Sequence, residues 1–575
     1  MKIDVSKVAF CRAGSCLTFG VVPPAWGQKG LLVRTMRSDR SGREVFRLSM
    51  VREGRAESCA IDATPARCSM VGRSGSIDLA LPAVDAARLR GRGAALRLEA
   101  IAARGVHAVP VGGGAWQVNV PASGVQYLLT PRRGGLRVED GRRVDDRPRG
   151  GRTAPAAPEP FSAEFVPGPD GRFEGAIEEF LTTPARRGLT GSFDEAVRSG
   201  HDAWTSWRKR LPPPPARYRA AAEQAMYVNY SAIVGPAGLL RRPTMLMSRN
   251  WMTHCWSWDH AFNAMPCARH DPRAAWDQFM TPFDFQDERG ALPDAVSPTD
   301  VWWNFCKPPI HGWALSRMMR RRGLLTGERA REIYPRLVRW TEWWMRERDH
   351  DGDGLPEYHH GNDSGWDNAT VFDGGYPVAG PDLAAFLVLQ MDALALLARR
   401  LRLLRDAARW RRDADALLRR LVARLWDGRR FRARKAFGGD PFPEGDSLIN
   451  AMPIVLGTRL PFAIRTRLAD ALAPDGRFVT RFGPATESPS SPLYRAGAYW
   501  RGPVWAPTTL IAVDGLARAG YPAQAREIAR RFCETCRTAG TFAENFDART
   551  GAPLCDPSYT WTSSVFLDLV YGFLG

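Results

Sequence analysis

The sequence predicts a multidomain fold, in which an N-terminal β-sandwich is followed by a helical barrel or toroid. Three observations carry this prediction. Apolar and polar residues alternate in the first third of the chain, apolar residues recur every three or four positions after about residue 218, and a proline run at 211–215 separates the two patterns. Alternation with period two is typical of half-buried strands, whereas spacings of three and four give a helix one apolar face.

The β region comes first along the chain. Its alternating runs are residues 46–50, 96–99, 116–120 and 136–139. Strands of this kind bury one face each, so two sheets packed as a sandwich are expected. Residues 141–160 are rich in Arg, Pro and Gly and are interpreted as a mobile loop or spacer. We place the sandwich at 1–200, with this loop inside it, and a proline-rich linker at 201–216.

The helical region extends over residues 217–575 and forms the second predicted domain. Its apolar stripes cover about 310–347, 383–401, 407–426, 503–519, 522–537 and 560–573. Loops dense in Trp, Asp, Gly and Pro alternate with these stripes. Helices that alternate with such loops favour a helical barrel or toroid with its functional site at one rim.

Composition narrows the class of protein further. The chain has 575 residues, of which 44% are apolar and 25% charged, as in a globular protein of several domains. Its net charge is +19, from six lysines and 74 arginines that are spread along the chain. Solvated helix faces explain that pattern better than a specific nucleic-acid site. Without a signal-like N-terminus or a long apolar run, we expect a cytoplasmic protein with no membrane partner.

Tryptophan gives the strongest functional signal. Several of the 20 tryptophans lie in loops beside carboxylates or arginine, in W-S-W-D-H-A-F (256–262), S-G-W-D-N (364–368), Y-W-R-G-P-V-W (499–505) and F-A-E-N-F-D (542–547). Indole rings cover the flat faces of sugars, while polar groups bind the hydroxyls. Glycoside hydrolysis needs two carboxyl groups. Asp367 and Glu544 could meet only across a barrel rim, and Asp259 and Asp547 are the rival acid and base.

These stretches, together with K-P-P-I-H-G-W-A (307–314), R-D-H-D-G-D-G-L-P-E-Y (348–358) and Y-T-W-T-S-S (559–564), occur in the order found in one known family. The chain resembles the family 63 glycoside hydrolases, which are related to trehalases and glucoamylase-like enzymes. The resemblance covers about residues 250–565. It implies an (α/α)6 barrel and an inverting, exo-acting α-glycoside hydrolase that releases a terminal α-glucose or α-mannose from an oligosaccharide or small glycoside.

The resemblance also assigns residues to roles. Asp367 would be the general acid and Glu544 the general base, and inversion requires their carboxyl groups to lie roughly 6.5–9.5 Å apart so that water fits between base and sugar. The substrate-binding residues would be Trp258, Asp259, Lys307, Trp366, Asn368, Trp500, Arg501, Gly502, Trp505 and Trp561.

Lys307 departs from the family pattern, because many relatives read S-Q-P-P where this chain has Cys306-Lys307-Pro308-Pro309. One hypothesis is that Lys307 binds sugar hydroxyls or a carboxylate-bearing aglycone such as glycerate. The alternative is a loop lysine in a salt bridge.

A candidate metal site lies just before the predicted acid. Asp349, Asp351 and Asp353 alternate and are followed by Gly354, with the carbonyl of Leu355 as a further ligand. This pattern is typical of a calcium-binding loop, although His360 stands where an EF-hand has glutamate. Some members of the resembled family hold calcium in the corresponding loop. We therefore predict a structural Ca2+ and no cofactor for the chemistry.

Other functions stay open at this stage. Within enzymes, a trehalase-like activity, a debranching α-1,6-glucosidase or a phosphorylase would use a related site. Outside enzymes, a catalytically silent carbohydrate- or polyanion-binding protein fits the basic charge. The partner is expected to be a small oligosaccharide or glycoside, and the protein to be a monomer or a small homo-oligomer.

Overall fold

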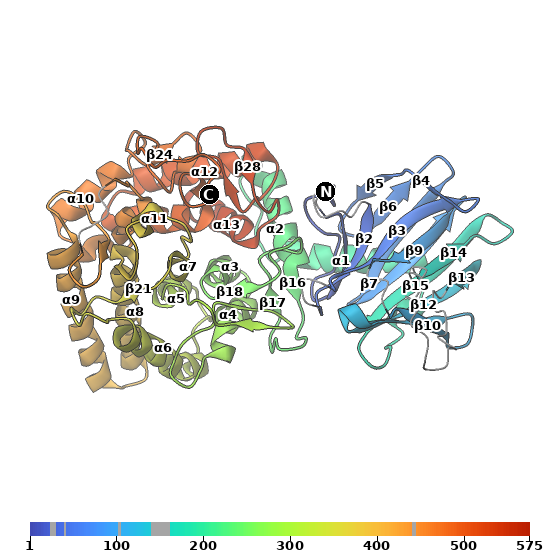
Figure 1. Cartoon of the computed structure of the whole chain (residues 1–575), viewed down its shortest axis with the longest axis horizontal. Coiled ribbons are helices and arrows are strands. Elements are labelled where there is room, and N and C mark those ends of the chain that lie inside the picture. The colour runs from blue at the N-terminus through green and yellow to red at the C-terminus, as the bar shows by residue number, and fades with distance from the viewer. Residues whose placement is uncertain (23–29, 39–41, 102–104, 140–160, 440–443) are drawn as a thin grey trace, which may run out of the picture.

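A computed structural model describes residues 1–22, 30–38, 42–101, 105–139, 161–439 and 444–575. The predicted loop at 141–160 lies outside these residues. Two parts lie side by side in Figure 1: a sheet-rich part built from the first third of the chain, and a helical part built from the rest. The predicted order of β structure followed by helices is therefore confirmed.

The sheet-rich part consists of two large antiparallel sheets. The first has the strand order β1 (Leu17–Gly20), β2 (Leu31–Thr35), β3 (Glu44–Arg52), β9 (Ala95–Ala100), β14 (Ser162–Val166) and β13 (Gly135–Glu139), with β4 (Arg55–Glu57) paired to β3. The second has the order β10 (His107–Pro110), β11 (Trp116–Val120), β12 (Val125–Arg133), β15 (Arg172–Phe180), β8 (Ala86–Arg92), β7 (Ser76–Ala83), β6 (Cys68–Val71) and β5 (Ala60–Ala63).

The inner faces of the two sheets share one apolar core. In the first sheet, Leu48 of β3 lies opposite Leu98 of β9, and both side chains are buried. Aromatic rings bridge the sheets: Phe46 meets Tyr127 with their ring centres 5.2 Å apart. The period of two that predicted these strands thus has its physical origin in burial of one face per strand.

A helix joins the two parts. Helix α1 (Phe193–Arg208) begins at a capping box, in which the Ser192 side chain accepts from the backbone N–H of Glu195, and it packs on β7. The helix therefore extends into the predicted linker at 201–216. The four prolines at 212–215 are not helical, and the short helix η4 (Ala216–Tyr218) follows them. The exact division into domains stays a prediction.

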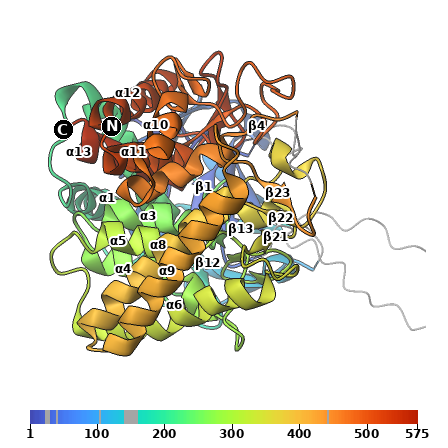
Figure 2. The same cartoon turned by 90° about the vertical axis from the view of Figure 1, so that its left-hand side faces the viewer.

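Six buried helical elements contact one another in a closed sequence of neighbours. They are α3 (Asp259–Cys267), α5 (His311–Met318), α8 (Pro381–Arg400), η7 (Leu448–Arg459), α11 (Ala506–Ala519) and α13 (Thr560–Phe573), which returns to α3. A second set packs against them from outside: α2 (Arg219–Ala232), α4 (Pro272–Met280), α6 (Gly327–Glu347), α9 (Leu404–Leu425), α10 (Phe462–Ala471) and α12 (Pro522–Ala539). Figure 2 looks onto this helical part, with α9 and α6 on the near side.

One predicted helical stripe is corrected. The stripe expected over 310–347 is two helices, because α5 ends at Met318 and α6 begins at Gly327. The hydroxyl of Thr326 caps α6 by accepting from the backbone N–H of Arg329 at 3.1 Å. Helix capping by threonine satisfies an amide that would otherwise lack a partner, so it fixes the start of the second helix.

Helix α8 is long and apolar enough to cross a membrane by length and composition alone. However, 89% of its most apolar 18-residue window is buried inside the protein. Its neighbours are α5, α6, α9 and η7, so its apolar surface is already covered by protein. A core helix of the ring explains this composition.

Short strands order the loops at one end of the ring. One three-stranded sheet pairs β18 (Cys255–Trp256), β19 (Ala295–Val296) and β20 (Val301–Trp302), and a second pairs β21 (Glu357–Tyr358), β22 (Val378–Ala379) and β23 (Arg434–Lys435). A third joins β26 (Val504–Trp505), β27 (Asn545–Phe546) and β28 (Pro553–Leu554). The last sheet pairs Trp505 with Asn545, so it brings the Y-W-R-G-P-V-W segment beside Glu544.

Arg34 of β2 links the sheet-rich part to the helical part. Its buried guanidinium donates to the backbone carbonyls of Arg249 and Asn250, the latter at 2.5 Å. Asn250 in turn donates its side-chain amide to Asp556 Oδ1 at 2.8 Å. The two parts are therefore joined by buried hydrogen bonds that start in the sheet and end among the loops of the ring.

Candidate active site

The loops bring the predicted carboxylates into one neighbourhood. Asp259 opens α3, Asp367 follows the short helix α7 (Gly361–Ser364), and Glu544 directly precedes β27. Tyr499 connects them, because the charges of both Glu544 and Asp367 act on its hydroxyl. The charge of Asp367 also raises the pKa of Asp259, and the charge of Asp259 raises the pKa of Glu544. Segments up to 285 residues apart in the chain thus contribute to one acidic cluster.

Glu544 is buried, with 3% of its surface exposed. The Tyr499 hydroxyl donates to its Oε1 at 2.8 Å, and its own backbone N–H donates to the Asp556 carbonyl at 2.8 Å. Burial raises the pKa of Glu544 to about 8, although the hydrogen bond from Tyr499 lowers it. Burial of this carboxyl group therefore favours its protonated form at neutral pH.

Asp259 is the second buried carboxyl group of the cluster. The hydroxyl of Tyr559 donates to its Oδ2 at 3.1 Å. Burial raises the pKa of Asp259 to about 8, with the positive charge of Lys307 acting in the opposite direction. At neutral pH Asp259 is therefore mostly protonated and can both donate and accept hydrogen bonds.

Asp367 is half-buried and lies in a tightly fixed loop. The preceding Gly365 has φ +74°, and a Cβ added there would lie 2.5 Å from the indole of Trp258. On the other side, Asn368 Oδ1 accepts from the backbone N–H of Trp500 at 2.9 Å. Arg501 donates through Nε to the Asn368 carbonyl at 2.9 Å and holds Asp373 with its two terminal nitrogens. Arg501 thus clamps the loop of Asp367.

The predicted substrate-binding tryptophans form a buried aromatic cluster beside the carboxylates. The rings of Trp500 and Trp505 stack with centres 3.9 Å apart and an interplanar angle of 7°. Trp258, Trp366 and Trp561 surround this pair, and all five are at most 3% exposed. Trp505 and Trp561 donate their indole N–H groups to the carbonyls of Tyr499 and Glu544. Among the described residues, the indole N–H of Trp500 has no acceptor.

Gly502 lies in the turn between these stacked rings. Its backbone N–H donates to Thr486 Oγ1 at 3.1 Å. A Cβ at this position would lie 2.7 Å from the Arg495 carbonyl. The close approach of backbone to backbone requires glycine and fixes the path from Trp500 to Trp505.

Lys307 is buried and paired. Its Nζ lies 3.1 Å from Asp294 Oδ1 and donates to the carbonyl of Asn362 at 2.5 Å. Burial lowers the pKa of Lys307, but the carboxylates of Asp294 and Asp367 outweigh it, so the net shift is upward. The ammonium group therefore stays charged. The contact with Asp294 matches the salt-bridge alternative, and a contact with substrate stays a prediction.

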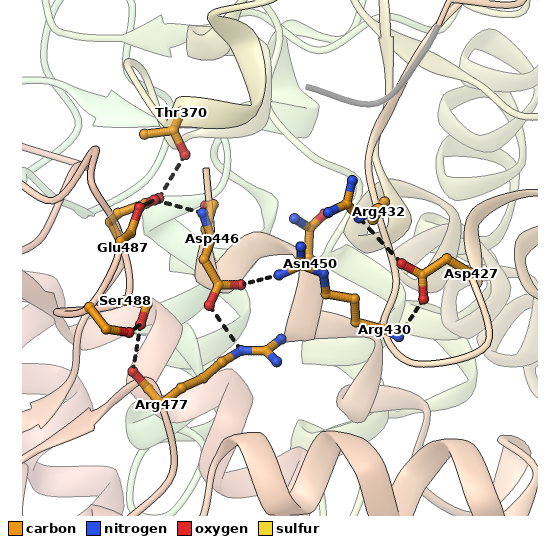
Figure 3. A network of polar contacts seen from close by, with 12 residues as sticks. Thr370, Asp427, Arg430, Arg432, Asp446, Asn450, Arg477, Glu487 and Ser488 are labelled. Carbon is orange, nitrogen blue, oxygen red and sulfur yellow. Dashed lines mark hydrogen bonds and ion pairs between the residues drawn. The ribbon is translucent and has the colours of Figure 1, made fainter. Parts of the chain in front are cut away.

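Figure 3 shows a polar network that includes Thr370. Thr370 donates its hydroxyl to Glu487 Oε2 at 2.7 Å, and Glu487 Oε1 accepts from the backbone N–H of Asp446 at 2.7 Å. Asp446 then pairs with Arg430 at 3.0 Å and with Arg477 at 3.1 Å. Thr370 is three residues from Asp367, so this network anchors the far end of the acid loop.

The aspartate-rich loop gathers as its spacing predicts. Carboxylate oxygens of Asp349, Asp351 and Asp353 lie within 4.8 Å of one another. Gly352 and Gly354 have φ of +69° and +81°, which lets the loop turn tightly. The loop also contacts the connection between α9 and η7, because Asp351 Oδ2 accepts from the backbone N–H of Phe437 at 2.9 Å.

Three residues of the cluster escape the sequence reasoning. Tyr499 and Tyr559 are the first residues of two of the motifs, but a tyrosine within a run of aromatic residues is usually interpreted as a core packing residue. Asp294 has no motif around it, and its importance depends on Lys307, which is 13 residues away in sequence. The position of Tyr499 directly before Trp500 is the one signal that could have indicated it.

Comparison with known proteins decides the family. Residues 252–562 match the mannosylglycerate hydrolase MGH1-like glycoside hydrolase domain, over more than half of the chain. The chain belongs to this family. It is a glycoside hydrolase, and the resemblance to family 63 is confirmed.

Individual relatives agree with this membership. This chain is 26% identical to the mannosylglycerate hydrolase of Rubrobacter radiotolerans, in a match that covers 98% of that protein and 58% of this chain. It is 25% identical to the glucosylglycerate hydrolase of Mycolicibacterium hassiacum, covering 91% of that protein and 55% of this chain.

Solved structures extend the likeness of fold. The mannosylglycerate hydrolase of Thermus thermophilus in complex with glucose matches with a TM-score of 0.51 at 20% identity, covering 99% of that chain and 61% of this one. A bacterial glucoamylase in complex with acarbose matches with a TM-score of 0.62 at 11% identity, covering 94% of that chain and 98% of this one. The glucoamylase thus shares the overall fold, including the sheet-rich part.

Proposed function

We propose that this protein is an inverting, exo-acting α-glycoside hydrolase that releases mannose or glucose from a small glycoside, with mannosylglycerate and glucosylglycerate as the first substrates to test. The cluster of Asp259, Asp367 and Glu544 beside stacked tryptophans carries this proposal. The hydrolases of both glycerate glycosides among the relatives support the choice of substrates. The closed sequence of helix neighbours and the glucoamylase likeness favour an (α/α)6 barrel.

In the proposed mechanism Asp367 protonates the glycosidic oxygen while Glu544 takes a proton from the attacking water. Asp367 is the more exposed of the two, which suits a group that must reach the leaving group. The hydrogen bond from Tyr499 stabilises the ionised form of Glu544, which is the form that can act as base. Asp259 would bind sugar hydroxyls. The indole N–H of Trp500, which has no acceptor within the described residues, would donate to a hydroxyl of the bound sugar.

The test is hydrolysis of mannosylglycerate, glucosylglycerate, trehalose and simple α-glucosides, with NMR detection of the first anomer released. We expect the β-anomer from an α-linked substrate. Asp367→Asn and Glu544→Gln should each lower kcat by about 10²–10⁴-fold. Asp547→Asn is the matched control and should keep activity, because the Asp547 side chain caps a turn by accepting from Arg549 and Thr550. Release of the α-anomer, or loss only in Asp547→Asn, would refute the assignment.

We also propose that Asp349, Asp351, Asp353 and the carbonyl of Leu355 hold a structural Ca2+. The gathering of three carboxylates in a glycine-containing loop supports this fit. When bound, the ion would neutralise the loop that precedes the acid segment. Removing calcium with EGTA should lower Tm in the natural protein and leave the Tm of Asp351→Asn unchanged. An equal response of both proteins would contradict the site.

A further inference from the structure

A second cluster of metal-ligand groups lies next to the aspartate-rich loop and contains nitrogen donors. His350, Glu357 and His359 each place one ligand atom within 4.8 Å of the other two. His350 lies within the loop between Asp349 and Asp351, Glu357 belongs to β21, and His359 follows that strand. The three residues therefore come from the loop and from the strand that follows it.

The two imidazoles converge through the same ring atom. The Nε2 atoms of His350 and His359 lie 2.8 Å apart, and the rings stack with centres 4.7 Å apart. Two nitrogens bound to one tetrahedral Zn2+ are roughly 3.3 Å apart, since each Zn–N bond is about 2.0–2.1 Å. A shift of about half an ångström in two exposed side chains would thus admit the ion. The ring that now donates would move its proton to Nδ1, which leaves both Nε2 lone pairs for the metal.

Glu357 supplies the second and independent observation. The residue is 1% exposed, and both carboxylate oxygens are buried. Backbone N–H groups of His350 and Asp351 lie nearby, but within the described residues neither oxygen makes a hydrogen bond of standard geometry. A buried carboxylate whose oxygens lack well-formed hydrogen bonds is costly unless a cation compensates it.

We infer that His350, Glu357 and His359 form a binding site for Zn2+ that adjoins the three aspartates of the proposed calcium loop but uses a different set of ligands. Imidazole nitrogens suit Zn2+, whereas Ca2+ takes oxygen ligands, so the two donor sets select different ions. The ion would tie the end of α6 to β21. Because β21 leads through α7 to Asp367, the site would stiffen the approach to the acid loop without contacting substrate.

The test uses the full chain, freed of metal and then kept in excess Ca2+ so that carboxylate-only sites are filled. We expect one equivalent of Zn2+ per chain, a visible absorption band when Co2+ replaces it, and a higher Tm with Zn2+. His350→Ala and His359→Ala should each weaken binding at least tenfold and remove the Tm shift. His201→Ala, which removes an exposed histidine of α1, is the control and should bind like the natural protein.

Glu357→Gln gives a readout that a folding defect would not mimic. It removes the carboxylate ligand at nearly constant volume, so the metal-free protein should stay folded with a similar Tm while the Zn2+-induced shift disappears. The inference is overturned if Zn2+ is not retained. It is also overturned if binding survives both histidine variants, or if it is lost in Asp351→Asn but not in them.

Discussion

At the scale of single residues, Tyr499 has the most consequential position. Its φ of +60° lies in the left-handed region that non-glycine residues rarely adopt, and the Trp505 indole holds its carbonyl at 3.0 Å. This backbone geometry aims the hydroxyl at Glu544. Strain of this kind persists only where the surroundings fix it, and here stacked indoles do so. The tyrosine is thus a positioning residue for the proposed base.

Replacing Tyr499 by phenylalanine should move the pH dependence of hydrolysis. The hydrogen bond from Tyr499 favours the ionised form of Glu544. Removing this bond therefore raises the pKa of Glu544 further above its present value of about 8. A base must be ionised, hence the rising acidic limb of kcat/KM should move to higher pH, with about a tenfold loss at pH 7. Tyr521→Phe removes a surface hydroxyl bonded to Thr466 and should leave the profile in place. Unchanged limbs in both variants would exclude this role.

At the scale of elements, the acid loop depends on contacts from several sides. Gly365 lies against Trp258, Asn368 binds the backbone of Trp500, and Thr370 is held by Glu487 (Figure 3). None of these partners is near in sequence. The motif S-G-W-D-N therefore indicates which residues form the loop, but only the fold shows what keeps its conformation.

Gly365→Ala should disable the loop. The new methyl group would lie 2.5 Å from the Trp258 indole, and alanine is strained at φ +74°. We expect the free energy of unfolding to fall by about 2–4 kcal/mol and activity by more than tenfold. Gly323→Ala is the matched control, because its φ is +79° but no atom lies within 4 Å of the added Cβ. That variant should lose only about 1 kcal/mol and keep full activity. Equal losses in the two variants would show that backbone strain alone is responsible.

The alternating runs and apolar stripes predicted the type of each element correctly, although the stripe at 310–347 is two helices, because each signal is local: one face of each element is buried. The contents of the site were harder to predict. For Lys307 the sequence left substrate binding and a loop salt bridge open, and no pattern indicates Asp294, the partner against which it is buried. The burial of Glu544 likewise depends on loops from three parts of the chain. Charge state and pairing are tertiary properties, so a motif cannot supply them.

At the scale of the whole molecule, buried ionisable groups make stability depend on pH. Within the described part of the chain, burial raises the pKa of five carboxyl groups to about 7 or 8: Glu179, Asp259, Glu357, Asp382 and Glu544. It lowers the pKa of His260 to about 3 and of His270 to about 4. The folded protein thus binds protons on the carboxyl groups that the unfolded chain releases above about pH 4, and it lacks imidazole protons that the unfolded chain binds below about pH 6.5.

These shifts give a definite sign above about pH 7.5. The imidazoles are almost fully neutral in both states above about pH 7.5, so only the carboxyl groups contribute there, and the free energy of unfolding should fall between about pH 7.5 and 8.5. Asp259→Asn should make this decline less steep, whereas Asp202→Asn, at an exposed position of α1, should not change it. Urea denaturation across this range measures the slope. A flat profile in the natural protein would contradict the buried protonated carboxyl groups.

The buried contacts of Arg34 also bear on how such chains can evolve. About two fifths of this chain has no counterpart in the Rubrobacter radiotolerans relative, which is matched along almost its whole length. A lineage that deleted the sheet-rich part in one step would strip the donor from two buried carbonyls, at Arg249 and Asn250. Asn250 binds Asp556, whose backbone holds Glu544, so that loss would reach the proposed base. Gain or loss of the sheets is therefore tied to compensating substitutions in the loops of the ring.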